Sequence, residues 1–295
     1  MTMPRLLVIG RSGQLAVSLA ALKTEAASLV CRGREVFDLS SAASVRALVE
    51  AERPAAIINA AAYTAVDRAE SEPDAAYAVN RDGPAHLAAV AAAKGIPLIH
   101  VSTDYVFDGT KTGRYREDDP TAPLGVYGAS KAAGEAVIRE RQVAHVILRT
   151  SWVHSPYGAN FVRTMLRLGG ERPELAIVAD QIGLPTYAPD LAEGVLGIAL
   201  AVVAGKSDGF GTFHLAGGGE PVSWYGFAQA IFQRAAERGA PLPCLRPIPA
   251  SEYPLPARRP ANSVLDCARM AAVYGVALRP WPDALDDGIR ALLLS

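Results

Sequence analysis

The sequence is short of cysteine, of net charge and of long apolar runs. Its 295 residues include three cysteines, Cys31, Cys244 and Cys267, which are widely spaced and form no CxxC pair. That pattern excludes a disulfide framework and a cysteine metal site, and it indicates a reducing compartment. Lys and Arg number 29 against 30 Asp and Glu, so the formal net charge is −1. This balance argues against nucleic acid or an anionic membrane as a partner.

Segments for membrane insertion, export or metal binding are also missing. The longest apolar stretch, 191–204, is interrupted by Glu193 and is shorter than the roughly 20 residues of a spanning helix. The first residues carry no signal-peptide pattern. None of the five histidines is paired with another at ligand spacing; they are His86, His100, His145, His154 and His214. We therefore expect a cytoplasmic protein without a catalytic metal.

What the sequence does contain is ample apolar material in an alternating pattern. Short apolar runs at 6–10, 28–31, 56–59, 98–102 and 146–149 lack in-out alternation, as strands buried on both faces of a parallel sheet do. Helix-like segments lie between them near 14–23, 41–52, 74–94 and 128–141, with Ser40 or Ser41 as a cap and Pro73 at a first turn. The alternation predicts an α/β fold with a Rossmann-type doubly wound parallel sheet.

The texture changes after residue 150, where Pro, Gly and Trp become frequent. Strands are expected near 176–179 and 212–216, and helices near 191–204 and 224–238, the latter capped by Ser223. The stretch 240–262 is rich in proline and is mostly not helix. We expect residues 1–150 and about 186–216 to form a dinucleotide-binding lobe. Residues 151–185 and 217–295 would mainly form a smaller mixed α/β substrate lobe.

A glycine turn follows the first strand, in the string Gly10-Arg-Ser-Gly13-Gln-Leu-Ala16. Such a turn brings backbone N–H groups and a helix N-terminus to a pyrophosphate, and its place at the first strand favours a nucleotide over an ordinary turn. An acidic residue that would hold the NAD ribose is missing after the second strand, where Arg32 and Arg34 could meet a 2′-phosphate. We predict that NADPH is used at least as well as NADH, unless both arginines are merely solvated.

Candidate reaction chemistry lies in two strings. Tyr127-Gly-Ala-Ser-Lys131 places a phenol and an ammonium on one helix face, where the cation would lower the phenol pKa. Thr103 and Asp104 end a predicted strand, so they would face the same crevice at the carboxyl edge of the sheet. The alternative for Thr103 and Asp104 is a turn or loop cap, and YxxxK alone also occurs by chance.

These motifs together resemble the extended short-chain dehydrogenase/reductase superfamily. Further strings resemble its dTDP-4-dehydrorhamnose reductase family over residues 5 to about 290; they are 59–67, 102–109, 149–153, 160–161, 180–186 and 259–263. The resemblance implies reduction of the 4-keto group of dTDP-4-dehydro-6-deoxy-L-mannose to dTDP-L-rhamnose, with hydride from NADPH or NADH. Tyr127 would be the general acid, Lys131 would hold the nicotinamide ribose, and Thr103 would bond the carbonyl oxygen.

The resemblance also implies the surrounding contacts. The cofactor would meet three groups of residues. The pyrophosphate turn is Gly10, Ser12, Gly13, Gln14 and Leu15. The adenine-contacting pair is Asp38 and Leu39, and the loop along the cofactor is Ala62, Tyr63 and Thr64. The substrate would meet Asp104, Trp152, Tyr105, Asn160 and Arg259. Alternatives are structural roles for Tyr105 and Arg259, and a helix cap for Asn160. Asn80 would anchor a buried water or a helix kink, unless it lies on a helix surface.

Departures from the family limit what is expected. Members that bind Mg²⁺ at a dimer interface use glutamates, where this sequence has Ser18 and Pro189. A metal-bridged dimer is therefore doubtful, and both a monomer and a homodimer are compatible with the sequence. Two rival functions remain: a non-catalytic NADP-binding regulatory subunit on the same scaffold, and a related sugar-nucleotide reductase or epimerase. Retention of Thr103, Tyr127 and Lys131 together argues against the first.

Overall fold

Six parallel strands form the large sheet of the computed structural model, which describes residues 3–293. The strand order is β10-β5-β4-β3-β1-β2, and every neighbouring pair is parallel. The strands are β1 (Arg5–Ile9), β2 (Ser28–Arg32), β3 (Ala56–Asn59), β4 (Leu98–Thr103), β5 (His145–Thr150) and β10 (Gly211–His214). This is the predicted doubly wound sheet, because the chain starts near one side, winds outwards to β2, and then returns through β3 to β10.

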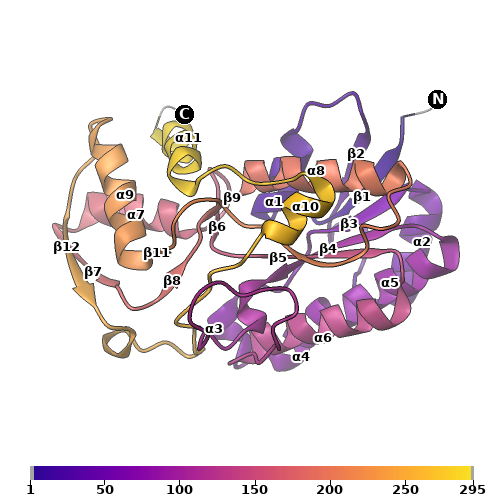
Figure 1. Ribbon diagram of the computed structural model, residues 1–295, viewed down its shortest axis with the longest axis horizontal. Helices are drawn as coiled ribbons and strands as arrows, with labels where there is room; N and C mark the ends of the chain where they lie inside the picture. Colours follow the sequence, from indigo (N-terminus) through magenta and orange to yellow (C-terminus); the bar gives the residue numbers. More distant parts are fainter. Residues whose placement is uncertain (1–2, 294–295) are drawn as a thin grey trace.

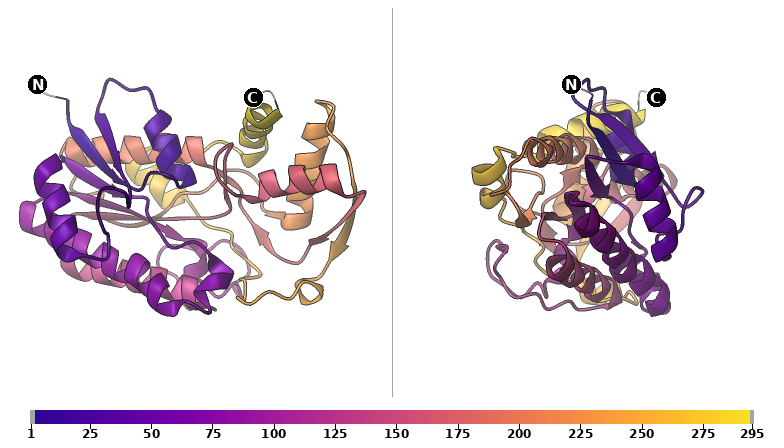
Figure 2. Two further views of the ribbon diagram at one scale, coloured as in Figure 1. Left: turned by 180° about the vertical axis from the view of Figure 1, so that it is seen from behind. Right: turned by 90° about the vertical axis from the view of Figure 1, so that its right-hand side faces the viewer.

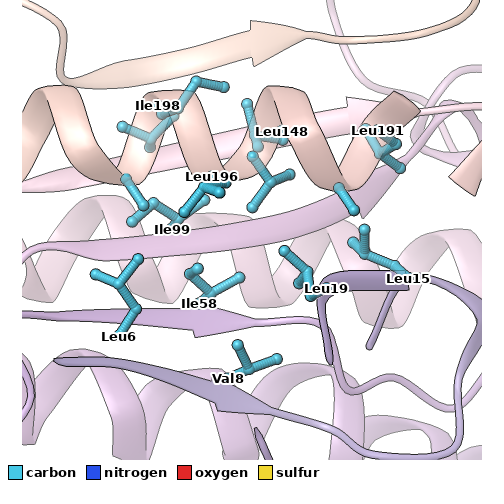
Figure 3. Packing of buried hydrophobic residues seen from close by; sticks show 14 of the residues in the cluster. Leu6, Val8, Leu15, Leu19, Ile58, Ile99, Leu148, Leu191, Leu196 and Ile198 are labelled. Atoms are coloured by element: carbon cyan, nitrogen blue, oxygen red, sulfur yellow. The ribbon is translucent and has the colours of Figure 1, made fainter. Parts of the chain in front are cut away.

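Helices cover both faces of this sheet (Figure 1). One face carries α1 (Gln14–Ala21) and α8 (Ala188–Val203), with α10 (Ala268–Tyr274) beside β10. The other carries α2 (Ala42–Glu52), α5 (Gly83–Lys94) and α6 (Val126–Arg141). Figure 3 shows the first of these two cores, where leucines and isoleucines of α1 and α8 meet those of the strands. Most residues of the inner strands β1, β3, β4 and β5 are buried on both faces, which explains why their sequence does not alternate.

A second group of elements lies beyond one end of the sheet, as both views in Figures 1 and 2 show. Its helices are α7 (Phe161–Glu171), α9 (Trp224–Ala236) and α11 (Trp281–Leu293). Its strands form two-stranded pairs: β7 (Glu174–Val178) with β12 (Cys244–Ile248), β8 (Ile182–Gly183) with β11 (Val222–Ser223), and β6 (Val153–His154) with β9 (Thr186–Tyr187). These elements share a separate apolar core that includes Met165, Ile177, Phe232 and Leu285.

Most predicted capping residues have that role. Ser41, rather than Ser40, accepts a hydrogen bond from the Ser44 N–H at the start of α2, and Ser223 accepts one from Gly226 at the start of α9. Pro73 occupies the first turn of α4 (Pro73–Tyr77). The proline-rich stretch contains β12 and the 3-10 turn η3 (Ala250–Glu252) rather than α-helix.

The predicted helix over 74–94 is wrong as a continuous element. The structure has α4, a π-helical turn η1 (Ala78–Asp82) and then α5. Pro84 lacks an N–H, so it cannot donate to the carbonyl of Asn80 as a regular helix would require. That carbonyl lies against Gly134 of α6, where any side chain would collide with it. The π-turn therefore follows from a proline and from close packing against α6.

Within residues 3–293, no helix has both the length and the apolar composition needed to cross a membrane.

Candidate active site

The glycine turn lies between β1 and α1, at the carboxyl edge of the sheet. Gly10 has φ +125°, a conformation that side chains rarely adopt, and its Cα faces the backbone of Ala60 and Ala61. Gly13 is the N-cap of α1, and a Cβ there would meet nothing within 4 Å. Ser12 is exposed, while Leu15 is buried in the core. The turn thus presents free N–H groups of a helix N-terminus beside open space, as an anion site requires.

Gln14 joins this turn to the second group of elements. Its side-chain amide donates to the Val153 carbonyl at 3.2 Å and accepts from Ser155 Oγ at 2.8 Å and from Asn160 Nδ2 at 3.0 Å. Asn160 is also the N-cap of α7, accepting from the Arg163 N–H. The structure therefore places Asn160 as a helix cap that also contacts Gln14.

The residues after β2 have partners that the sequence did not predict. Arg32 forms an ion pair with Glu52 of α2 at 2.7 Å, and its guanidinium also donates to the Cys31 carbonyl. Arg34 is exposed. Asp38 accepts from the N–H and the hydroxyl of Ser40, which shapes the turn before α2. The arginine expected to meet a 2′-phosphate is thus occupied by a carboxylate.

The loop after β3 carries Ala62, Tyr63 and Thr64 and is tied to the helix that holds Tyr127. Buried Asn80 accepts from the Tyr63 N–H at 2.8 Å and donates to the Tyr63 carbonyl and to Ser130 Oγ, both at 3.0 Å. The Tyr63 hydroxyl donates to Glu72 at 2.6 Å. Asn80 is therefore an internal anchor at the π-turn, not a helix-surface residue.

Thr103 and Tyr127 meet where β4 ends and α6 begins. Thr103 is the last residue of β4, and Tyr127 lies in the first turn of α6. The Thr103 hydroxyl lies near enough to the Tyr127 hydroxyl to influence its pKa, and the Tyr127 ring packs edge-on against Tyr105 at 5.4 Å between centroids. Gly128 permits this approach, because a side chain there would collide with the Tyr105 carbonyl. Burial raises the pKa of Tyr127 to about 12, and the neighbouring Thr103 hydroxyl acts against this rise.

Lys131 lies one turn further along α6 and is 1% exposed. Its Nζ donates to the Val101 carbonyl at 2.7 Å and lies 3.2 Å from His100 Nε2. Burial lowers the pKa of Lys131 to about 8, although the nearby Glu135 raises it. The sequence reasoning missed His100; the available signal was a histidine inside an otherwise apolar strand, two residues before Ser102.

Asp104 is buried directly after Thr103. Its Oδ1 accepts from Thr103 Oγ1 at 3.0 Å, and Ser263 also bonds to the carboxylate. Its Oδ2 has no partner among the described residues. Burial raises the pKa of Asp104 to about 6, despite these hydrogen bonds. A buried carboxylate oxygen without a partner is costly, and such oxygens are typical of sites that receive a ligand.

Trp152 follows β5 in a strained conformation with φ +47°. Its indole stacks on Trp224 of α9, with centroids 3.4 Å apart and planes 6° apart, and Gly183 leaves room for the ring. Phe161 packs on Trp224 at 4.6 Å. Sequence reasoning did not find Trp224, whose contact with Trp152 depends on how α9 packs. Strain of this kind persists only where surrounding contacts impose it.

Arg259 is the last predicted site residue, and it too has a partner. Its guanidinium donates two hydrogen bonds to Asp67, at 2.8 and 3.2 Å, and Asp67 also accepts from the Ala257 N–H. The Arg259 charge also opposes the rise in the pKa of Tyr105 that burial causes. Tyr105 is thereby coupled electrostatically to the Arg259–Asp67 pair. Arg259 thus connects the segment after η3 to α3 (Val66–Ala69), which follows the Ala62–Thr64 loop.

No cluster of three or more His, Cys, Asp or Glu side chains in residues 3–293 is arranged to hold a metal ion. Ser18 is buried in α1 and donates to the Gln14 carbonyl. The carboxyl edge therefore brings together Thr103, Asp104, Tyr127 and Lys131, with the glycine turn beside them. This arrangement can move a proton at a phenol and receive an anion at a helix N-terminus.

Comparison with known proteins gives a consistent result. The model of the RmlD substrate binding domain matches residues 4–293. A dTDP-4-dehydrorhamnose reductase of Sinorhizobium fredii is 46% identical over 291 residues, covering 98% of each chain, and one of Aggregatibacter actinomycetemcomitans is 44% identical over 300 residues, covering 98% of this chain and 99% of the other. The crystal structure of the Bacillus anthracis enzyme of that name, in complex with NADP, matches with a TM-score of 0.89 at 35% identity, over 97% of this chain and 99% of the other. The chain belongs to the dTDP-4-dehydrorhamnose reductase family.

Proposed function

We propose that this protein is a dTDP-4-dehydrorhamnose reductase, which reduces the 4-keto group of dTDP-4-dehydro-6-deoxy-L-mannose to dTDP-L-rhamnose with NADPH or NADH. Family membership over nearly the whole chain supports this reaction. The observation that carries it is the buried contact between the Tyr127 and Thr103 hydroxyls, next to a carboxylate oxygen of Asp104 that lacks a partner. A proton donor, a second hydroxyl and a free acceptor are the groups that a keto sugar needs.

Tyr127 acts as the general acid. Its raised pKa keeps the phenol protonated at neutral pH, which reduction requires at the start. NADPH, when bound, supplies the hydride that reaches C4 of the sugar. The phenol proton passes to the sugar O4, so the ketone becomes a secondary alcohol and the phenolate regains a proton from solvent. Thr103 turns its hydroxyl from Asp104 Oδ1 to the same oxygen and stabilises the charge that develops there.

The dinucleotide is held by the first lobe. Lys131 holds the nicotinamide ribose. The other contacts are the pyrophosphate turn, the pair that flanks the adenosine and the loop along the cofactor, which are respectively Gly10, Ser12, Gly13, Gln14 and Leu15, then Asp38 and Leu39, then Ala62, Tyr63 and Thr64. We propose that NADPH is used at least as well as NADH. The NADP complex of the Bacillus anthracis relative supports this preference. Arg34 is exposed and is better placed for a 2′-phosphate, because Arg32 is paired with Glu52.

The sugar nucleotide lies against the second lobe. Asp104 accepts a hydrogen bond from a sugar hydroxyl, and Tyr105 and Trp152 flank the sugar ring. Arg259 and Asn160 lie on the diphosphate side, although Arg259 must share its guanidinium with Asp67. The two lobes comprise residues 1–150 with about 186–216, and mainly 151–185 with 217–295. Separate apolar cores support two lobes, although Met270 of α10 belongs to the core of the large sheet and Phe107 to the second core. A cytoplasmic monomer or homodimer fits three free cysteines.

The deciding experiment is turnover of a panel of 4-keto-6-deoxy sugar nucleotides with NADPH and with NADH, followed by the stereochemistry of the product. We expect turnover of the dTDP sugar and a product with the L-rhamno configuration. Turnover of another sugar or base alone would identify a related reductase. Binding of NADPH without turnover of any keto sugar would favour a non-catalytic subunit. Equal activity of Tyr127→Phe would refute the acid assignment.

A further inference from the structure

A chain of three buried side chains lies behind the proposed reaction centre. Asn59 at the end of β3, His100 in β4 and Lys131 in α6 are each at most 1% exposed. Asn59 Nδ2 lies 3.0 Å from His100 Nδ1, and His100 Nε2 lies 3.2 Å from Lys131 Nζ. The chain therefore runs from the turn after β3 to the lysine of the YxxxK motif.

Hydrogen-bond partners fix the direction of this chain at its Asn59 end. The Ala61 N–H donates to Asn59 Oδ1 at 3.2 Å, so the amide oxygen points to the backbone and the NH₂ group faces His100. His100 Nδ1 must accept from that NH₂ group. A neutral imidazole has one protonated nitrogen, and the proton is therefore on Nε2.

The Nε2–H group faces Lys131 Nζ, and this decides which form of the lysine fits. An ammonium has only donors, so it would oppose the Nε2–H across 3.2 Å. A neutral amine has a lone pair for the Nε2–H and retains a hydrogen for the Val101 carbonyl at 2.7 Å. An imidazolium is excluded too, because its Nδ1–H would oppose the Asn59 NH₂ group. One arrangement alone satisfies every group: a neutral His100 and a neutral Lys131.

We propose that Asn59 and His100 are positioning residues that favour the neutral amine form of Lys131 until a dinucleotide binds. Burial acts in the same direction, since it lowers the pKa of Lys131 to about 8 and keeps that of His100 well below its ordinary value. Bound dinucleotide, a polyanion, raises the pKa of the lysine, which then takes up a proton and turns its donors to the ribose. The second step rests on the proposed function; the first does not.

Other charged groups around α6 do not supply the missing acceptor. Glu135, one turn beyond Lys131, is held by two hydrogen bonds to Arg149 of β5 and one from Ser102. The remaining titratable or charged groups on α6, on the elements packed against it and beside them are Asp67, Arg68, Glu70, Glu72, Asp74, Tyr77, Arg81, Asp82, His86, Lys94, Asp104, Tyr105, Tyr127, Arg139, Glu140, Arg141 and His145. None of them is hydrogen-bonded to Lys131 Nζ within residues 3–293.

The protein suits a direct titration of Lys131 because it has five lysines, of which Lys131 alone is buried. We would label lysine with ¹³C at Cε and follow its NMR shifts against pH in the full-length protein. Wild-type Lys131 should titrate near pH 8 without dinucleotide and at least one pH unit higher with saturating NADPH. A midpoint above 10 in the free protein would overturn the proposal. A free midpoint near 8 with no response to NADPH would leave the first step standing and count against the dinucleotide step.

Two variants and one control separate this role from packing. His100→Gln places an amide oxygen near the Nε2 position, where it accepts from an ammonium, so the free midpoint should rise by at least one unit. Asn59→Asp should do the same. Its carboxylate would accept a hydrogen bond from a protonated Nδ1, so Nε2 would be unprotonated and its lone pair could accept from the Lys131 ammonium. His145→Gln alters another buried histidine at the opposite end of β5 and should leave the midpoint near 8. An unchanged midpoint in either folded variant overturns the assignment.

A further measurement needs no variant. Imidazole ¹⁵N spectra of the wild-type protein at about pH 9, where an amine with a midpoint near 8 is mostly neutral, should show His100 protonated at Nε2 and unprotonated at Nδ1. Protonation at Nδ1 would overturn the proposal even if both variants failed to fold.

Discussion

Asp104 tests the site directly, because the free-energy cost of burying its ionised carboxylate can be removed by exchanging one oxygen for an NH₂ group. Asp104→Asn replaces a carboxylate by a neutral amide of the same shape. The carboxyl is 2% exposed, with hydrogen bonds from Thr103 and Ser263 to one side and no partner for Oδ2 among the described residues. An amide oxygen can keep the hydroxyl contacts, and the NH₂ group takes the place of the unpartnered oxygen.

The magnitude follows from the pKa. Burial raises the pKa of Asp104 from 3.8 to about 6, so the folded protein holds this proton more tightly than the unfolded chain does. Wild-type stability therefore falls as pH rises from about 4 to about 6, and the loss is complete above that range. At 1.36 kcal/mol per pKa unit, the rise of about two units corresponds to about 3 kcal/mol. Asp104→Asn escapes this loss and should be more stable than wild type at pH 7, by up to that amount.

Thermal unfolding between pH 4 and 8, on wild type and variant, measures this effect. The variant should lack the decline between pH 4 and 6, whereas its kcat/KM should fall roughly 10-fold or more, because an ionised acceptor for a sugar hydroxyl is lost. Asp108→Asn is the control: hydrogen bonds lower the pKa of Asp108, first the one from the Thr110 N–H, so its removal should not stabilise the protein. A variant of Asp104 that is less stable at pH 7, with the same pH slope as wild type, would refute the reasoning.

Three further variants test the site and its support. Tyr127→Phe should lower kcat by about 10²–10⁴ while calorimetry shows unchanged NADPH affinity; a parallel loss of affinity would mean that the phenol binds rather than reacts. Glu135→Gln leaves the buried Arg149 charge uncompensated and should cost about 3–5 kcal/mol in urea unfolding, against which a neutral result would count. Gly128→Ala should lower both activity and thermal midpoint, because its methyl would strike the Tyr105 carbonyl. Gly170→Ala, where nothing lies within 4 Å, should instead stabilise by about 0.4–1 kcal/mol.

The sheet could be predicted closely because its signal is local. Strands β1 to β5 lie within one or two residues of the apolar runs, since a strand buried on both faces must be apolar along its length. Caps such as Ser41 and Ser223 are equally local, because the partner N–H is three residues away. The break in the 74–94 helix was missed, because the π-turn depends on contact with Gly134 of α6, far along the chain.

The candidate site divides in the same way. Motifs placed Thr103, Tyr127 and Lys131 at the carboxyl edge, where the structure brings Thr103 and Tyr127 into contact. The partners of the charged residues could not be predicted, since Arg259 meets Asp67 from 192 residues away and His100 meets Lys131 across 31 residues. Such pairs are set by packing of distant elements. Their consequence is chemical, because they decide which arginine is free and which form of a lysine fits.

Buried charge is treated in two ways in this protein, and the contrast marks the reaction centre. Glu135 is as buried as Asp104, yet two hydrogen bonds from Arg149 and one from Ser102 keep its pKa below the ordinary value. The pKa values of Asp104 and Lys131 are instead shifted towards their neutral forms. A fold that can pair one buried carboxylate fully has the means to pair another. The missing partner of Asp104 Oδ2 is therefore best supplied from outside the chain by a sugar hydroxyl, and the negative charge that would favour the Lys131 ammonium by a dinucleotide, and both positions lie at the same edge of the sheet.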